Sequence, residues 1–329
     1  MTRTAPAQWA FDQIIEIDRH TPFCGAFFRA SDERRQVIAA YLSAKPPAPE
    51  EMAEVGRFLL KADHRAILER AHGRYVEGSR GALRRAGEAV HEEPFYSLLH
   101  QTLAEPPHKA AVRAVGRLTR LDYSRLLALW ALPETICCAE VIEILEDPAS
   151  SFDCSDAKAA FELLSSRGVD AESLANALTQ ARSRREFAKV WETFMLTMEA
   201  PDHPVEADES YRPVRNPQEL HSLARRYRNC ARRYSVDLVN PDAGTAFAEA
   251  RHGGQGAVVH LEKHNGKWRL EGMYGPRNTR PGRVFYQRTE QYLAAHGVQI
   301  ARPHRRAQTE WDALRRLATS GFEFGLDFE

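Results

Sequence analysis

Three residues in the last third of the chain have side chains suited to nucleophilic or acid–base chemistry. Cys230 lies in an arginine-rich run, and nearby positive charge favours the nucleophilic thiolate over the thiol. Counting outward from an Asn265-Gly266 turn places His260 opposite Glu271, and a carboxylate beside an imidazole orients the ring for proton transfer. These residues predict a cysteine-dependent enzyme with His260 or His252 as its base. They also fit a structural role, as a cysteine on a helix edge and a polar pair across two strands.

Arginine suggests a second kind of chemistry, because its planar guanidinium offers paired donors that match phosphate oxygens. The arginines form two groups, one on an expected helix and one in a turn-rich loop. With two neighbouring asparagines, the candidate nucleic-acid-binding residues are Arg225, Arg228, Asn229, Arg232, Arg233, Arg277, Asn278, Arg280 and Arg283. Interleaved aromatic residues such as Tyr274 could stack on unpaired bases. The alternative is that the arginines are solvated or paired with acidic residues of the same chain.

The cysteines and histidines give no pattern typical of a metal centre. The five cysteines are scattered and odd in number, and the sequence has no CxxC or HExxH motif. Reduced thiols are expected, with no bound metal and no cofactor.

Four elements must position the candidate residues. Asn216 and Pro217 are a typical helix start, and apolar residues at helical spacing predict a helix that continues to Tyr234. Cys230 lies at the edge of its apolar face and is expected to be at least half buried. Strands are expected at 256–263 and 267–274, joined by the Asn265-Gly266 turn, with a further strand at 245–251. A helix at 284–296 should follow and end at Gly297.

The first 200 residues are a succession of expected helices, interrupted at proline and glycine. They form an irregular bundle or a solenoid-like array. The expected helices span 50–73, 75–90, 95–103, 109–118, 124–131, 134–145, 155–165, 171–182 and 184–198. An acidic, proline-containing run at 201–210 is expected to be a solvated linker. The predicted fold class is α+β: a helical domain at 1–200, this linker, and a small basic domain at 211–329 with a short antiparallel sheet packed by helices.

Composition narrows the functional classes. The chain has 329 residues, is 43% hydrophobic and 27% charged, and shows no run of about 20 apolar residues for a membrane span. Its start lacks the apolar core of a secretory signal, so a cytoplasmic protein without membrane contact is expected. The net charge of zero hides an asymmetry, because residues 209–329 contain 20 Lys and Arg against 13 Asp and Glu. This excess suits a polyanion-binding face, or attraction between the two parts of the chain.

The C-terminal part resembles the PcfJ-like family over about residues 211–300. The resemblance lies in Tyr227-Arg228-Asn229-Cys230, Tyr234, the strand at 257–262 and Gly275-Pro276-Arg277-Asn278. It implies an association with conjugative plasmids, phages and other mobile elements, and it assigns no reaction. The chain departs from the family where Ala231 and two arginines follow the cysteine. It also has Leu270-Glu271-Gly272 in place of a glutamine-containing strand, which puts any glutamine-dependent role in doubt.

Three functions follow from these features. The first is a nucleic-acid-associated protein of a mobile element or phage-related system, which binds the phosphate backbone of DNA or RNA through its C-terminal domain. The second is a non-catalytic adaptor whose N-terminal helices dock a protein partner. The third is an enzyme that uses Cys230.

Overall fold

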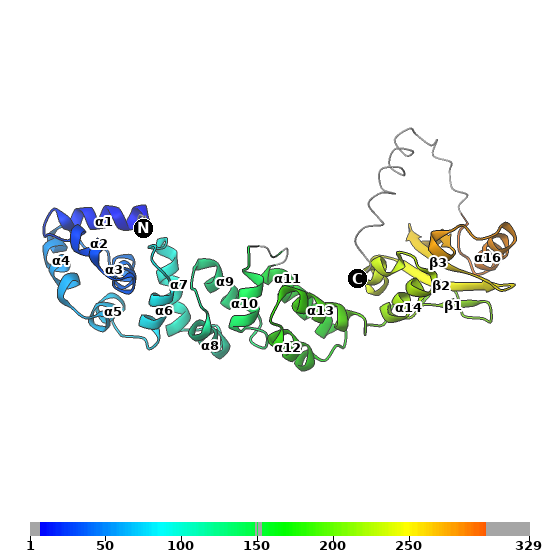
Figure 1. Ribbon diagram of the computed structural model, residues 1–329, viewed down its shortest axis with the longest axis horizontal. Helices are drawn as coiled ribbons and strands as arrows, with labels where there is room; N and C mark the ends of the chain where they lie inside the picture. Colours follow the sequence, from blue (N-terminus) through cyan, green and yellow to red (C-terminus); the bar gives the residue numbers. More distant parts are fainter. Residues whose placement is uncertain (1–6, 149, 151–152, 301–329) are drawn as a thin grey trace, which may run out of the picture. The chain divides into compact units, whose positions relative to one another are not determined.

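A computed structural model describes residues 7–148, 150 and 153–300. It confirms the α+β class, because helices make up the first part of the chain and a four-stranded antiparallel sheet with packed helices follows. The chain divides into two compact units, Met1–Phe194 and Met195–Glu329, and each is considered by itself (Figure 1). Among the described residues, no helix combines the length and the apolar character needed to cross a bilayer.

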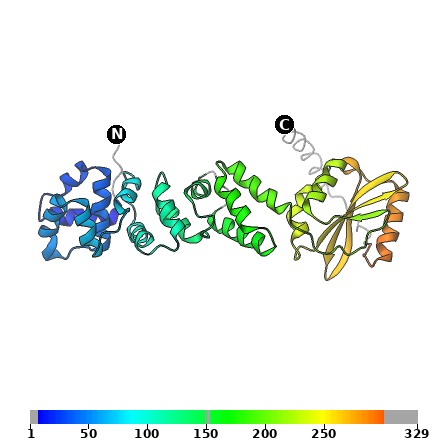
Figure 2. The ribbon, with the colours of Figure 1, turned by 90° about the horizontal axis from the view of Figure 1, so that it is seen from below.

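The first unit is helical, and its helices pack chiefly on others close to them in the chain (Figures 1 and 2). Its helices are α1 (Gln8–Asp18), α2 (Cys24–Arg29), α3 (Asp32–Ala44), the 3-10 turn η1 (Pro49–Glu51), α4 (Met52–Lys61), α5 (His64–His72), α6 (Ser79–Arg85), α7 (Glu93–Ala104), α8 (Lys109–Arg117), α9 (Tyr123–Ala131), α10 (Ala139–Leu145), α11 (Cys154–Ser166), α12 (Ala171–Gln180) and α13 (Arg184–Met195). Helix α3 is the centre of the first part, where it packs on α5, α6 and α7.

Three of the expected helices are shorter than the apolar pattern indicated. The segment 50–73 is broken because the Asp63 carboxylate accepts the Ala66 N–H at 2.8 Å and so starts a new helix. Segment 75–90 is helical only over Ser79–Arg85, and segment 134–145 only over Ala139–Leu145. Apolar spacing alone does not reveal where a side chain competes for the backbone N–H groups.

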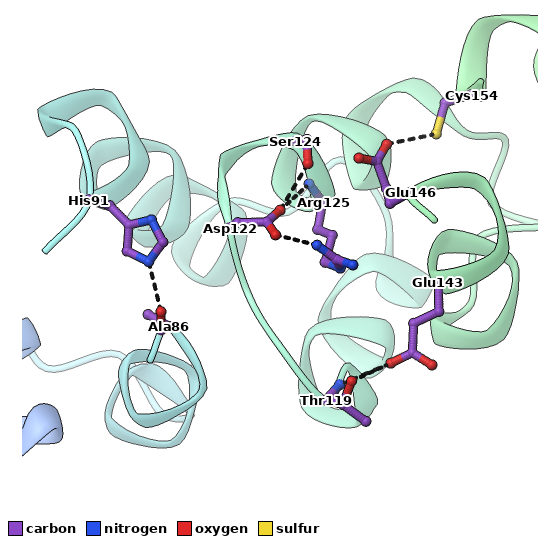
Figure 3. Close-up of polar contacts among 9 residues, drawn as sticks. All are labelled: Ala86, His91, Thr119, Asp122, Ser124, Arg125, Glu143, Glu146 and Cys154. Atoms are coloured by element: carbon purple, nitrogen blue, oxygen red, sulfur yellow. Dashed lines mark hydrogen bonds and ion pairs between the residues drawn. The ribbon is translucent and has the colours of Figure 1, made fainter. Parts of the chain in front are cut away.

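Polar contacts join neighbouring helices of the middle of this unit (Figure 3). The Glu143 carboxylate on α10 accepts both the backbone N–H of Thr119, at 3.1 Å, and its hydroxyl, at 2.8 Å. Asp122 caps α9 by accepting the Arg125 N–H at 3.0 Å and pairs with the Arg125 guanidinium. The bonds of Glu143 hold the loop between α8 and α9 against α10, and those of Asp122 fix the first turn of α9.

The second unit is built around a sheet of order β1-β2-β3-β4, in which every neighbouring pair is antiparallel. The strands are β1 (Tyr211–Pro213), β2 (Thr245–His252), β3 (Gln255–His264) and β4 (Lys267–Tyr274), and the helices are α14 (Pro217–Tyr227), η2 (Ala231–Tyr234), α15 (Ser235–Val239), η3 (Pro276–Asn278) and α16 (Arg283–Ala295). Alternate residues face opposite ways, so Val259 packs with Phe285 of α16 while Val258 packs with Leu223 of α14. The sheet is therefore covered by a helix on each face.

The segment 201–210 is exposed over most of its length, as expected of a solvated linker, but it is anchored at one buried residue. Val205 is buried in the core between the sheet and α16, and the Tyr292 hydroxyl of α16 donates to the Glu206 carbonyl at 3.1 Å. Burying the apolar side chain of Val205 holds the segment against the second unit, despite its acidic composition.

The β3–β4 hairpin has the predicted turn and the predicted register near the turn. Asn265 and Gly266 both have positive φ, and Glu262 faces Arg269 and Leu261 faces Leu270. A β-bulge then shifts the register, so His260 faces Gly272 and the predicted pairing of His260 with Glu271 is wrong. The extra residue allows Leu270 and Met273 to enter the same core, which strict alternation would forbid.

The helix expected to reach Tyr234 ends at Tyr227. Arg228 adopts a left-handed conformation with φ of 49°, and the Asn229 N–H donates back to the Ala224 carbonyl at 3.0 Å. The five arginines at 225–233 therefore do not lie along one helix face. Cys230 is exposed, contrary to expectation, because Ala231 takes the buried position after the break.

Candidate nucleic-acid interface

A cleft of about 810 Å³ opens in the second unit where three segments meet. The end of α14 contributes Arg226 and Tyr227. Strand β2 and the β2–β3 turn contribute residues 249 and 251–256, and the loop after β4 contributes residues 275, 276 and 279–282. The end of α14 and the loop after β4 were expected near the site, whereas the β2–β3 turn takes the place expected for the β3–β4 hairpin. The cleft lies at the opposite end of β3 from the Asn265-Gly266 turn.

A buried carboxylate organises one wall of the cleft. The side chain of Glu249 is 6% exposed and accepts hydrogen bonds from the Tyr227 hydroxyl at 2.8 Å and from the guanidiniums of Arg226 and Arg251 at 3.0 Å each. The two arginine side chains are about half exposed, at 54% and 45%. One carboxylate thus holds two guanidiniums beside each other, and their remaining N–H groups and one unit of positive charge are presented to the cleft.

The Tyr227 hydroxyl is a fixed donor in this arrangement. Burial, together with the hydrogen bond to Glu249 and its charge, raises the pKa of Tyr227 to about 12. The hydroxyl therefore remains protonated at neutral pH and continues to donate to the carboxylate.

Glycines allow the walls to come this close. A Cβ on Gly256 would lie 2.0 Å from the Tyr227 hydroxyl oxygen, and one on Gly275 would lie 2.9 Å from Thr279 Oγ1. Gly253 and Gly254 form the β2–β3 turn with positive φ. In the sequence, the only sign of this wall is a Glu-x-Arg pattern at residues 249–251 followed by three glycines at 253, 254 and 256. This pattern matches no established phosphate-binding motif.

The loop after β4 is a tight turn that presents polar side chains to solvent. The Gly275 N–H donates to the Thr279 carbonyl at 2.7 Å, and Arg277 and Asn278 both have positive φ. Arg277, Asn278 and Arg280 are exposed, and the Arg280 guanidinium lies 5.3 Å from the centre of the Tyr286 ring.

The predicted nucleic-acid-binding residues lie on the same unit but not all in the cleft. Arg280 lines it, and Arg226, which flanks the predicted set, lines it too. Asn229 is half buried, and its side-chain oxygen accepts the Ala231 N–H at 3.1 Å, so it shapes the break after α14. The remaining predicted arginines and Asn278 are exposed. Within the described part of the chain, no ion pair to an acidic side chain is formed by Arg225, Arg228, Arg233, Arg277, Arg280 or Arg283.

The predicted catalytic residues are not brought together. Cys230 is exposed near the end of α14, whereas His260 is buried, with its ring stacked on Phe247 at 4.5 Å. Burial lowers the pKa of His260 to about 4. Glu271 is exposed near the hairpin turn. No hydrogen bond between these three side chains occurs among the described residues, so the geometry gives no support to a cysteine-dependent enzyme.

Comparisons of the chain with protein-family models, with curated proteins and with solved structures gave no match. The resemblance to the PcfJ-like family therefore stays a prediction from the motif residues. Of those residues, Asn229 and Cys230 follow the end of α14, while Gly275 and Asn278 belong to the loop that borders the cleft.

Proposed function

We propose that the second unit binds nucleic acid through its phosphate groups, with the cleft as the principal contact. The observation that carries this proposal is the pair of half-exposed guanidiniums held by the buried Glu249. A guanidinium already fixed in position loses little conformational freedom when it binds, and each has donors left for phosphate oxygens.

The residues around the cleft favour a polyanion as its ligand rather than a single small anion. Exposed arginines without an acidic partner in the described chain lie both on the segment after α14 and on the loop after β4. A backbone with regularly spaced charges can contact several of them together, and the release of counterions then adds to affinity. Tyr274, which is 38% exposed at the end of β4, offers a ring on which a base could stack.

The resemblance to PcfJ-like proteins supports the same proposal and extends it to a role in a mobile element or phage-related system. Its motif residues fall at the end of α14 and in the loop after β4, two of the segments that border the cleft. They shape the backbone there, as Asn229 does through its bond to Ala231.

The test is fluorescence anisotropy of the full chain with labelled single- and double-stranded DNA and RNA across a salt series. We expect the variant Arg226→Ala/Arg251→Ala to lose about tenfold in affinity or more and to reduce the salt slope by about one per phosphate contact removed. Arg288→Ala, an exposed arginine of α16 outside the cleft, is the matched control and should bind as the unaltered chain does. Absence of binding to every probe at low salt, or equal losses in the double variant and the control, would contradict the proposal.

A further inference from the structure

Three potential metal ligands lie close together near the turn of the β3–β4 hairpin, away from the cleft, and the buried His260 lies beside one of them. His260, Glu262 and His264 alternate along β3 and so point to one face of the sheet. Glu271 comes from β4, where the β-bulge removes it from regular pairing. The ligand atoms of Glu262, His264 and Glu271 all lie within 4.8 Å of one another.

The spacing between neighbouring donor atoms is that of ligands around an ion. The distance from His264 Nε2 to Glu262 Oε2 is 3.4 Å, and that from His260 Nε2 to Glu262 Oε1 is 3.5 Å. Two ligands of a tetrahedral zinc ion, each about 2.0–2.1 Å from the metal, are about 3.3 Å apart.

His260 contacts one of these ligands from the buried side of the sheet. Its side chain is 4% exposed, and its Nε2 atom has no hydrogen-bond partner among the described residues although it points at Glu262. Leaving a buried polar atom unsatisfied costs about 1–3 kcal/mol, so a closer contact between His260 Nε2 and the Glu262 carboxylate would be favourable. The stacking of the ring on Phe247, at 4.5 Å and 3°, already fixes its orientation.

We propose that Glu262, His264 and Glu271 bind a divalent transition metal of the zinc type, with water completing its coordination, and that the buried His260 positions the Glu262 carboxylate. One imidazole and two carboxylates form a mixed nitrogen and oxygen set, which favours zinc and its first-row neighbours over magnesium or calcium. This site shares no residue with the cleft and does not depend on nucleic-acid binding.

The competing explanation is that neighbouring cations neutralise the carboxylates. Lys267 faces His264 and Arg269 faces Glu262 in the register of the hairpin. Within the described chain, however, neither forms an ion pair with Glu262 or Glu271, so the carboxylates are left to each other and to the histidines. Two carboxylates this close repel each other unless a cation or a proton lies between them.

The test is calorimetric titration of the tag-free, chelator-treated full chain with Zn²⁺, and with Mg²⁺ in parallel. We expect one Zn²⁺ per chain and no comparable binding of Mg²⁺. The variants His264→Ala and Glu271→Gln, both at exposed positions, should each weaken Zn²⁺ binding by about tenfold or more, because each removes a ligand. His296→Ala, an exposed histidine at the end of α16, is the control for adventitious binding and should leave the affinity unchanged.

Two further measurements make the assignment falsifiable. Binding of Co²⁺ should give the intense visible absorption of a four-coordinate ion, and His260→Phe, which keeps an aromatic ring against Phe247, should weaken binding and alter that spectrum. Circular dichroism of each metal-free variant shows whether it is folded. The site is refuted if the unaltered chain binds Zn²⁺ no better than a Glu262→Gln/His264→Ala variant, or if the His296 control loses as much. An unchanged affinity and spectrum in His260→Phe would overturn the positioning role of His260.

Discussion

At the scale of single residues, the backbone around the cleft adopts conformations that L-amino acids avoid. Arg228, Arg277 and Asn278 all have positive φ, and two of them are arginines, for which this conformation costs about 1–2 kcal/mol. At the end of a helix this position is usually glycine. Non-glycine residues in strained positions are more common at functional sites, and here they belong to the segments that border the cleft.

Arg228→Gly should therefore change stability and nucleic-acid binding in opposite directions. Glycine relieves the left-handed strain after α14, so the free energy of unfolding should rise by up to about 1 kcal/mol, while the loss of a guanidinium weakens nucleic-acid binding. Arg228→Ala is the matched control, because it removes the same charge without relieving the backbone. Urea unfolding and fluorescence anisotropy of both variants are the measurements. A glycine variant no more stable than the alanine variant would show that Arg228 is not strained.

A second prediction concerns Gly256, whose lack of a side chain makes room for Tyr227. Gly256→Ala should lower the free energy of unfolding by about 1–3 kcal/mol, because the added methyl group would displace the Tyr227 hydroxyl from Glu249. The same displacement should weaken nucleic-acid binding. Gly116→Ala, where no atom lies within 4 Å of the added Cβ, should be neutral or stabilising by up to about 1 kcal/mol. Equal effects of the two changes in thermal unfolding would refute the steric argument.

At the scale of elements, local sequence signals predicted where helices and turns begin. They did not predict where a helix ends or a strand register shifts because of packing. Asn216 caps α14 as predicted, since its side chain accepts the Glu219 N–H at 2.8 Å, and Asn265-Gly266 makes the predicted turn. The end of α14 and the bulge beside Glu271 were missed. Both depend on which nearby residue enters the core, Ala231 in one case and Met273 in the other, and this choice is set by packing against other elements, which no spacing rule contains.

The same limit explains what was predicted of the site. The arginine-rich segments were found because their charge is visible in composition alone. The role of Glu249 was not predicted, because nothing near it in the sequence shows that α14 places Arg226 and Tyr227 within hydrogen-bond distance of its carboxylate. The proposed metal ligands were not predicted for a related reason. Zinc motifs such as HExxH assume a helix, whereas Glu262 and His264 lie on a strand and Glu271 on its neighbour.

Between elements of the first unit, a pair of histidines makes stability depend on pH. The rings of His72 on α5 and His100 on α7 stack at 3.7 Å, and burial, with a further contribution from His100, lowers the pKa of His72 from 6.5 to about 4. The unfolded chain then binds protons more readily than the folded one between these values, so stability should be full above about pH 6.5 and fall as the pH drops toward 4. His72→Phe keeps the stacking and should flatten this dependence. Thermal unfolding at a series of pH values is the measurement, and an unchanged profile in the variant would refute the assignment.

At the scale of the whole molecule, the two units have separate cores and opposite charge. The basic excess belongs to the C-terminal part, which also contains the cleft and the proposed metal site, while the N-terminal helices contribute no residue to either. Binding to one unit should therefore stabilise that unit alone, because a ligand stabilises only the fold whose unfolding destroys its site.

Hydrogen exchange of the full chain, with and without a saturating oligonucleotide, tests this expectation. At a free oligonucleotide concentration about a hundred times its Kd, the free energy of opening of the second unit should rise by about 2.7 kcal/mol, which slows exchange of its slowest amides about a hundredfold. The amides of α3 and α7, in the core of the first unit, should exchange at unchanged rates. The Arg226→Ala/Arg251→Ala variant at the same oligonucleotide concentration should show a much smaller effect on β2 and β3. Equal slowing in both units would mean that they unfold as one body or that the nucleic acid contacts both, and would remove the basis for assigning binding to the second unit alone.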